Sequence, residues 1–421
     1  MWNKVQNDWR KQLIFCSILA MLVGLFFSRA TLSIGVGAFI VCSLFHKKVP
    51  AQVLNFFSTP LLWGMSLLFL LPMLSGLWST DKQEWAEMMR IKLPLFFLPV
   101  AFAAPFNFSI NDWKRITFIF LVFITGATFY SLWYYLSEAK QVHIEYLQSR
   151  LMLTALENDH VRFSWLVSIA VVLTTWLFFT NKNKSPKWVR YFLAGIATWL
   201  IIYLHILAAR TGLLCLYTMA FLSAIWFLIK ERKKNLSAVL FISLIVLPVI
   251  SFFIFPTFQN RVKYFLYDLS YFRKAEYLPG SNDGTRMLSI KAGWNVLNEH
   301  PVSGAGFGDI LSNTHLWYEK NYPQMIETDK IYPSSEWLMY GSGCGWPGFL
   351  LFTFMMILPF FTRHSKNNLS WLLVNISVIL IFLFDIGLEV QYGIFLYSFI
   401  VLAFWKYNTE TLIEPLKHNL Y

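Results

Sequence analysis

Two arginines stand where a membrane protein rarely keeps a cation, and both have the chemistry to bind phosphate. Arg210 falls between two apolar runs, in the sequence HILAARTGLL of residues 205–214. Arg286 lies in the polar segment 256–344, which follows a later apolar run. A guanidinium group binds phosphate through two parallel hydrogen bonds. The alternatives are an Arg210 that only contacts lipid headgroups and an Arg286 that is a solvated helix residue.

A run of glycines follows Arg286, in the sequence HPVSGAGFGD of residues 300–309. Glycines at such spacing cradle phosphate in dinucleotide-binding and P-loop proteins, where a strand precedes them and a helix follows. Here no strand pattern precedes the run, and no Gly-Lys-Ser or Gly-Lys-Thr sequence appears in it. We therefore predict a tight turn at which the backbone approaches another element.

The composition defines the setting in which these residues act. The chain of 421 residues is 57% hydrophobic and only 14% charged, with a mean hydropathy of +0.51. A soluble domain needs more charge, so the composition predicts a polytopic membrane protein. The net charge of +12 comes largely from basic clusters between apolar runs, at 4–11, 46–48, 182–190, 230–234 and 363–366. This is the pattern of cytoplasmic loops, and we expect no nucleic-acid partner.

Apolar runs predict an all-α protein of about twelve membrane spans. They cover residues 12–28, 30–45, 59–78, 91–106, 116–136, 162–180, 190–209, 212–229, 236–255, 345–362, 369–387 and 391–405. With a cytoplasmic start, the basic clusters face the cytoplasm and 79–90, 137–161 and 256–344 lie outside. We expect both termini to be cytoplasmic, and residues 1–421 to form one transmembrane domain with a large periplasmic loop, 256–344, between the ninth and tenth spans.

Two polar segments outside the spans carry helix signals. The sequence NDGT of residues 282–285 can cap a helix that runs to about Glu299 and stops before Pro301. One face of this helix is predicted to be apolar and to consist of Met287, Ile290, Trp294 and Leu297. A second face is formed by Arg286, Ser289 and Gly293. The segment 81–92, which contains Arg90, alternates charged and apolar residues in the manner of an interfacial helix.

The order of these features resembles that of the O-antigen ligase and O-antigen polymerase superfamily. The shared features are RTGLL at 210–214, Thr285-Arg286 before Trp294, HPxxGxGxG from His300, and GxxG at 345–348. The similarity covers about residues 200–360 and extends to LSGLWSTD at 74–81, which is similar to the family's Trp-Ser motif. Members of this superfamily are inner-membrane glycosyltransferases that move a glycan from undecaprenyl diphosphate to lipid A core, to a growing glycan or to protein.

The resemblance implies roles for individual residues. Arg210 and Arg286 occupy the positions of the two arginines that handle the diphosphate, and Arg90, His300 and Ser334 complete the predicted substrate-binding set. Preorganised donors of this kind each contribute on the order of 3 kcal/mol to a transition state. No Asp-x-Asp pair lies in the outer loops, and no loop carries a pair of cysteines. We therefore expect an inverting reaction without a metal ion or another cofactor.

One position departs from the family pattern. The family's loop ends in His-Asn-x-x-Leu, and counting back from the closing glycines places Ser334 where that histidine belongs. The histidine is the family's proposed base or acceptor-positioning group. Glu336 and His315 are the nearby replacements, and apolar neighbours could make Glu336 more basic. Asp385 and Glu389, near the outer end of the eleventh span, are the next candidates.

The residues and the resemblance together predict an O-antigen ligase in the bacterial inner membrane. A polymerase of the same family and a protein O-glycosyltransferase stay open, because the sequence does not identify the acceptor. A flippase or transporter of lipid-linked sugars is the alternative from another class, but such proteins carry charges deep inside their spans. The expected partners are an undecaprenyl-diphosphate-linked glycan, a glycan or lipid A core acceptor, and membrane lipids.

Overall fold

The computed structural model describes residues 2–148, 150–180, 186–273, 277–362 and 368–418, and within these ranges the regular elements are all helical. The helices are α1 (Trp2–Phe27), α2 (Arg29–Leu44), α3 (Val49–Ser58), α4 (Pro60–Ser75), α5 (Lys82–Lys92), α6 (Pro94–Phe102), α7 (Ile110–Ser137), α8 (Ala139–Leu147), α9 (His160–Thr180), α10 (Lys187–Leu207), α11 (Arg210–Ile229), α12 (Lys234–Ile254), α13 (Pro256–Arg273), α14 (Asn282–Glu299), α15 (Ile310–Asn321), α16 (Glu336–Phe361), α17 (Leu369–Phe384) and α18 (Gln391–His418). Two short 3₁₀ turns lie between these helices: η1 (Phe307–Asp309) precedes α15, and η2 (Glu327–Asp329) follows it. The all-α class is confirmed.

Fewer helices than predicted meet the length and composition of a membrane span. In the described residues seven helices qualify, α1, α7, α9, α10, α11, α12 and α16, and an eighth span results if the bent pair α2 and α3 is counted as one. The predicted run 91–106 is not one helix, because the chain breaks before Pro94 and α6 is nine residues long. Such a helix rises only about 13 Å, against a hydrocarbon core of roughly 30 Å. Twelve spans therefore stay a prediction.

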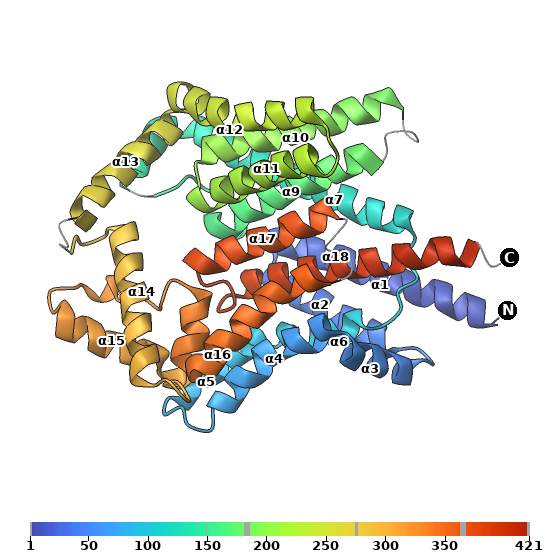
Figure 1. The fold of residues 1–421 in the computed structure, drawn as a ribbon, viewed down its shortest axis with the longest axis horizontal. Coiled ribbons are helices and arrows are strands. Elements are labelled where there is room, and N and C mark those ends of the chain that lie inside the picture. Colours follow the sequence, from blue (N-terminus) through green and yellow to red (C-terminus); the bar gives the residue numbers. More distant parts are fainter. Residues whose placement is uncertain (1, 149, 181–185, 274–276, 363–367, 419–421) are drawn as a thin grey trace.

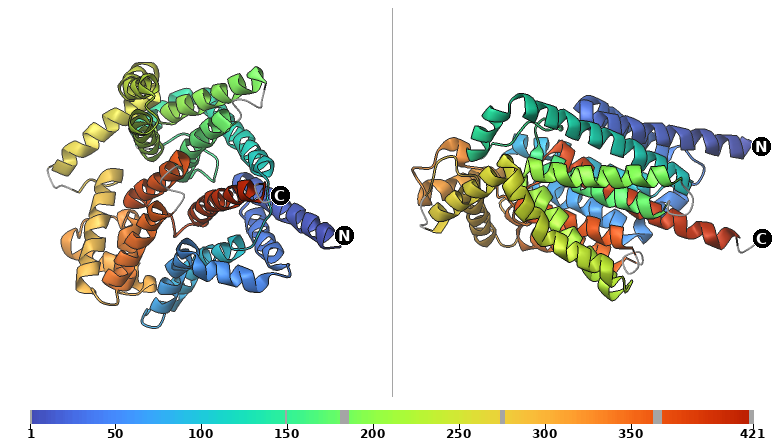
Figure 2. Two further views of the ribbon diagram at one scale, coloured as in Figure 1. Left: turned by 45° about the vertical axis from the view of Figure 1, so that its right-hand side comes forward. Right: turned by 90° about the horizontal axis from the view of Figure 1, so that it is seen from above.

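The two ends of the helical bundle differ in what they carry. The N- and C-termini lie at one end, whereas α13, α14 and α15 gather at the other, as Figure 1 and Figure 2 show. The segment 256–344, predicted as a loop, is thus largely helical. Its place opposite the termini is the arrangement expected if the two ends face opposite sides of a membrane. The basic cluster 363–366 and residues 181–185 lie outside the described residues.

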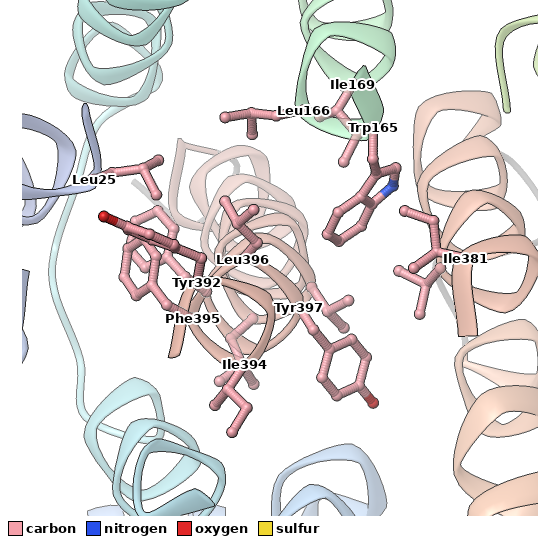
Figure 3. Packing of buried hydrophobic residues seen from close by; sticks show 14 of the residues in the cluster. Leu25, Trp165, Leu166, Ile169, Ile381, Tyr392, Ile394, Phe395, Leu396 and Tyr397 are labelled. Atoms are coloured by element: carbon pink, nitrogen blue, oxygen red, sulfur yellow. The ribbon is translucent and has the colours of Figure 1, made fainter. Parts of the chain in front are cut away.

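The core forms where α18 runs alongside α9 and α17. On α9 nearly every side chain from Phe163 to Val172 is buried, and a helix that is apolar all round belongs in the interior. Trp165 extends from α9 toward α17, where its Nε1 donates to the Ser377 Oγ at 3.0 Å (Figure 3). This packing fixes the N-terminal turn of α9, and with it Arg162, in the middle of the protein.

The glycine run forms the tight turn that the sequence predicts. Gly304 has a φ of 70°, and a Cβ there would lie 2.3 Å from the backbone nitrogen of Cys344 in α16. At Gly308 a Cβ would lie 2.0 Å from the carbonyl oxygen of Asp81. Asp309, which follows, accepts hydrogen bonds from the backbone of Thr80 and Asp81 at 2.5 and 3.0 Å. The turn therefore clamps α16 and the segment after α4 against each other.

Helix α14 has the predicted bounds, but its buried face is not the predicted one. The buried residues are Thr285, Leu288, Ser289, Ala292, Gly293, Val296 and Leu297. Trp294, assigned to the apolar face, is 39% exposed. The reason is close approach: a Cβ at Gly293 would meet Pro333 at 2.7 Å, so small side chains make the contact with α16 and the segment before it. The buried face of α14 thus combines small residues, which permit this close approach, with Leu288, Val296 and Leu297.

The sidedness of the molecule gives a direct test. Asn282, at the start of α14, and Lys234, at the start of α12, are both exposed. In a chain whose Cys16 and Cys42 are replaced by alanine, we expect a cysteine at position 282 to react with an impermeant thiol reagent in intact spheroplasts. A cysteine at position 234 should react only after permeabilisation, because basic clusters face the cytoplasm. The reverse labelling would contradict the predicted topology.

Candidate active site

Charged residues from four helices converge on the segment that joins α17 to α18. This connector, residues 385–390 with the sequence DIGLEV, follows the last residue of α17 and precedes α18. It lies at the end of the bundle where α13–α15 gather (Figure 1). Asp385 has an extended backbone, with φ −154° and ψ 159°. Helices α5, α9, α14 and α16 each bring a charged side chain to the connector or to the residue before it.

Two arginines flank Asp385. The Arg162 guanidinium, from the first turn of α9, lies 3.0 Å from the Asp385 Oδ2 and also donates to the Ile386 carbonyl. The Arg286 guanidinium, from α14, lies 3.7 Å from the Asp385 Oδ1 and donates to the Phe384 carbonyl at 3.1 Å. Their exposure differs, because the Arg162 side chain is 10% exposed and that of Arg286 is 39% exposed. Arg286 is therefore the one open to a ligand.

Arg210 approaches the same helix from another side. It begins α11 and forms an ion pair with Asp283, which lies in the first turn of α14, three residues before Arg286. Its guanidinium also lies 5.1 Å from the centre of the Phe265 ring. Three residues correspond to less than one helical turn, about 4.5 Å of rise. The structure thus brings both predicted phosphate-binding arginines to the start of α14.

A third arginine adds positive charge beside Arg210. Arg261, from α13, is close enough that burial first, and then the charge of Arg210, lowers its pKa to about 10, while Asp283 acts in the opposite direction. At neutral pH the Arg261 guanidinium is still protonated, because the pH is well below that pKa. Two guanidinium groups, those of Arg210 and Arg261, therefore lie near each other where α11, α13 and α14 meet, with Asp283 as a counter-charge.

A buried charge cluster holds the connector from its other side. The Lys92 side chain, from α5, is 0% exposed, and its Nζ donates to the Leu388 carbonyl at 2.8 Å and to the Glu389 carboxylate at 2.6 Å. Glu336, the first residue of α16, is also 0% exposed and accepts from the backbone of Gly387 at 3.0 Å and Leu388 at 3.4 Å. Because buried charges are costly unless paired, this cluster marks the connector as a segment whose position the fold fixes.

The candidate bases from the sequence occupy different surroundings. Glu336 lies beneath the connector as just described, within the same network as Arg286. Ser334, at the family's histidine position, is buried with its Oγ 3.0 Å from that of Ser289, one turn after Arg286 on α14. His315 lies on α15, where its Nε2 is 3.2 Å from the Lys330 carbonyl oxygen. The network around Asp385 therefore includes Glu336 and borders Ser334, whereas the described contacts of His315 are to its own loop region.

The other two predicted substrate-binding residues lie apart from the arginines. Arg90 is exposed on α5, two residues before the buried Lys92. His300 follows α14, fourteen positions after Arg286, which corresponds to about 21 Å along a helix. It lines a polar cavity of about 680 Å³ together with Thr80, Asp81, Gly304, Ala305, Asp309, Ser312 and Asn313. The structure thus assigns His300 to a second polar region at the far end of α14.

Sequence reasoning missed Lys92, Arg162 and Arg261. A signal existed for the first two. Arg162 stands at the predicted outer end of a span, which is the feature that singled out Arg210. Lys92 fell inside the predicted run 91–106, and an ionisable residue within an apolar run indicates function. Arg261 had no distinguishing signal, since it is one of several cations in the polar segment.

Comparison with known families agrees with the resemblance. Residues 195–353 match the family model described as O-Antigen ligase. The match and the membrane-spanning helices support a membrane protein similar to the O-antigen ligases, a family that implies glycosyl transfer. The match covers the part of the chain in which the resemblance to the O-antigen ligase superfamily is found, and no curated protein matches the chain. The match includes Arg210, Arg286 and Glu336, whereas the connector lies beyond its C-terminal limit.

Proposed function

We propose that the protein transfers a glycan from an undecaprenyl-diphosphate donor to an acceptor at the outer face of the bacterial inner membrane, as an O-antigen ligase. One observation carries this proposal: two partly exposed arginines, Arg286 on α14 and Arg210 on α11, gather at the start of α14, each paired with a carboxylate. Arg286 is 39% exposed and Arg210 is 31% exposed. A diphosphate offers several anionic oxygens. These suit two planar guanidinium groups better than the carboxylate oxygens of Asp385 and Asp283 that the two arginines contact in this structure.

The arginines supply the electrostatic part of the reaction. As the bond from the anomeric carbon to the diphosphate oxygen breaks, negative charge grows on the leaving group. Arg286 and Arg210 exchange Asp385 and Asp283 for phosphate oxygens and neutralise that charge. Arg261 adds to the positive field without needing direct contact. Attack by the acceptor from the opposite face of the sugar ring inverts the anomeric centre.

The cavity beside His300 suits the glycan of the acceptor or the donor. Its lining combines hydroxyl, amide, carboxylate and imidazole groups, which hydrogen-bond sugar hydroxyls. It lies about 21 Å from Arg286 along α14, so a chain of several sugars reaches both places. This arrangement favours an extended glycan over a single sugar as the transferred or accepting group.

The test is reconstitution with defined substrates. The purified protein in proteoliposomes is mixed with an undecaprenyl-diphosphate-linked glycan and lipid A core, and the products are separated by electrophoresis. We expect covalent transfer to lipid A core that persists in EDTA. Longer lipid-linked glycans without transfer to lipid A core would instead identify a polymerase. Movement of the donor across the bilayer with no covalent product would overturn the enzyme proposal in favour of a flippase.

A further inference from the structure

We propose that Asp385 is the base that removes the proton from the acceptor hydroxyl. This inference rests on the proposed function and adds the residue that performs its second chemical task. The resemblance left that task open, because Ser334 stands at the family's histidine position and a hydroxyl is a poor proton acceptor at neutral pH.

The contacts of Asp385 place a carboxylate beside the donor-binding arginine. Its Oδ1 lies 3.7 Å from Arg286, and its Oδ2 lies 3.0 Å from Arg162 but accepts no hydrogen bond. The Asp385 side chain is 11% exposed. A phosphate bound to Arg286 would bring the anomeric carbon, and hence the attacking hydroxyl, close to this carboxylate. Asp385 therefore lies beside the arginine expected to bind the donor, and its Oδ2 is buried without a hydrogen-bond donor, as are the Glu336 Oε1 and the Glu389 Oε2.

The alternative bases are less well placed. Glu336 is 0% exposed and faces the backbone of Gly387 and Leu388, so an acceptor could reach it only by displacing the connector. Glu389 faces Lys92 in the same buried cluster, with 7% of its side chain exposed. His315 lies on α15, and its described hydrogen bond is to the Lys330 carbonyl. Geometry thus makes Glu336 a positioning residue, and it leaves Asp385 facing the arginines.

The buried cluster explains how Asp385 is held. Glu336, Lys92 and Arg162 all bind backbone atoms of the connector, at Gly387, Leu388 and Ile386. A backbone fixed at three successive residues leaves the neighbouring aspartate little freedom to move. A catalytic group must be held to within a fraction of an ångström of its working position, and buried supporting contacts achieve this.

The proposed step is a displacement at the anomeric carbon coupled to one proton transfer. The acceptor oxygen forms a bond to the anomeric carbon while the bond from that carbon to the diphosphate breaks, and its electron pair leaves on the diphosphate. The acceptor proton passes to the Asp385 carboxylate. Donor binding prepares this transfer, because Arg286 exchanges Asp385 for phosphate and leaves the Oδ1 of the carboxylate as a free acceptor, while Arg162 stays paired with Oδ2. Once the diphosphate departs, Arg286 returns, and its positive charge favours release of the proton to water.

The decisive variant is Asp385→Asn, which keeps size and shape but cannot accept the proton. We expect the turnover number to fall by roughly 10²–10⁴-fold, while the Kd for undecaprenyl diphosphate stays unchanged or decreases. Asp112→Asn is the matched control, because Asp112 is also a buried, ion-paired aspartate but pairs with Lys11 at 2.5 Å. Asp385→Ala should regain part of its turnover when formate is added, since a small carboxylate can occupy the vacated space.

Two results would overturn this role. The first is turnover by Asp385→Asn within a few-fold of the unchanged chain. The second is a parallel loss of donor binding and turnover, which would mean that Asp385 only orients Arg286. Thermal unfolding identifies a variant that fails to fold, and Asp385→Glu, which keeps the carboxylate, then serves in its place and should retain measurable transfer. Failure of the unchanged protein to transfer any glycan would contradict the proposed function instead.

Discussion

Replacing Arg286 by alanine is expected to reduce glycan transfer by at least about 10²-fold without lowering the amount of protein in the membrane. The loss of one preorganised donor to a developing negative charge costs on the order of 3 kcal/mol. Arg210→Ala should have an effect of similar size, since Arg210 reaches the start of α14 through its ion pair with Asp283. Arg286→Lys should recover only part of the activity, because lysine keeps the charge but loses the planar pair of donors. Transfer is measured in membranes by electrophoresis of labelled lipopolysaccharide.

Lys291 provides the control on the same helix. It is exposed on α14, five residues after Arg286, so Lys291→Ala removes a positive charge from the same helix. We expect transfer by this variant to stay near that of the unchanged protein. Near-normal glycan display by either Arg286→Ala or Arg210→Ala would rule out the diphosphate-binding role.

Replacing Lys92 by methionine is expected to destabilise the protein by about 3–5 kcal/mol, because it removes the cation that neutralises Glu389 and its neighbour Glu336. The three side chains are 0–7% exposed, so solvent cannot replace the lost partner. The midpoint of thermal unfolding in detergent reports the change. Lys82→Met, which removes an exposed lysine from the same helix, should shift the midpoint little.

A double variant distinguishes the contribution of the Lys92 charge to stability from the contribution of its packing. Lys92→Met combined with Glu389→Gln removes one cation and one anion, so it should lose less stability than Lys92→Met alone. Equal losses in the single and double variants would show that Lys92 acts through packing rather than through its charge.

Much of the helical pattern could be predicted from the sequence, because apolar runs report helices directly. The predicted helix from 282 to 299 and the predicted spans 162–180, 212–229 and 236–255 agree with α14, α9, α11 and α12 to within a few residues at either end. The break before Pro94 is a local event that a run of apolar residues conceals. The buried face of α14 was predicted wrongly, since hydrophobicity does not reveal where two backbones must approach closely.

Only part of the candidate site could be predicted from the sequence. Arg210 and Arg286 stood out because they contradict the charge bias of membrane proteins. The connector did not, because its importance comes from contacts between residues far apart in the chain. Lys92 meets Glu389 across 297 positions, and Arg162 meets Ile386 across 224. No local pattern records such pairs, and they appear only once the helices are packed.

The same long separation has a consequence for how the protein is made. Lys92 is synthesised and delivered to the membrane well before residues 385–390 leave the ribosome. During that interval its ammonium group has no counter-charge, and an unpaired charge in the hydrocarbon core is costly. We expect the α5–α6 segment to stay near the water interface and to settle only when α17 and α18 arrive. A chain terminated before residue 385 would carry Arg210 and Arg286 yet lack Asp385, so under our proposal nascent and prematurely terminated molecules would have no base with which to consume the donor.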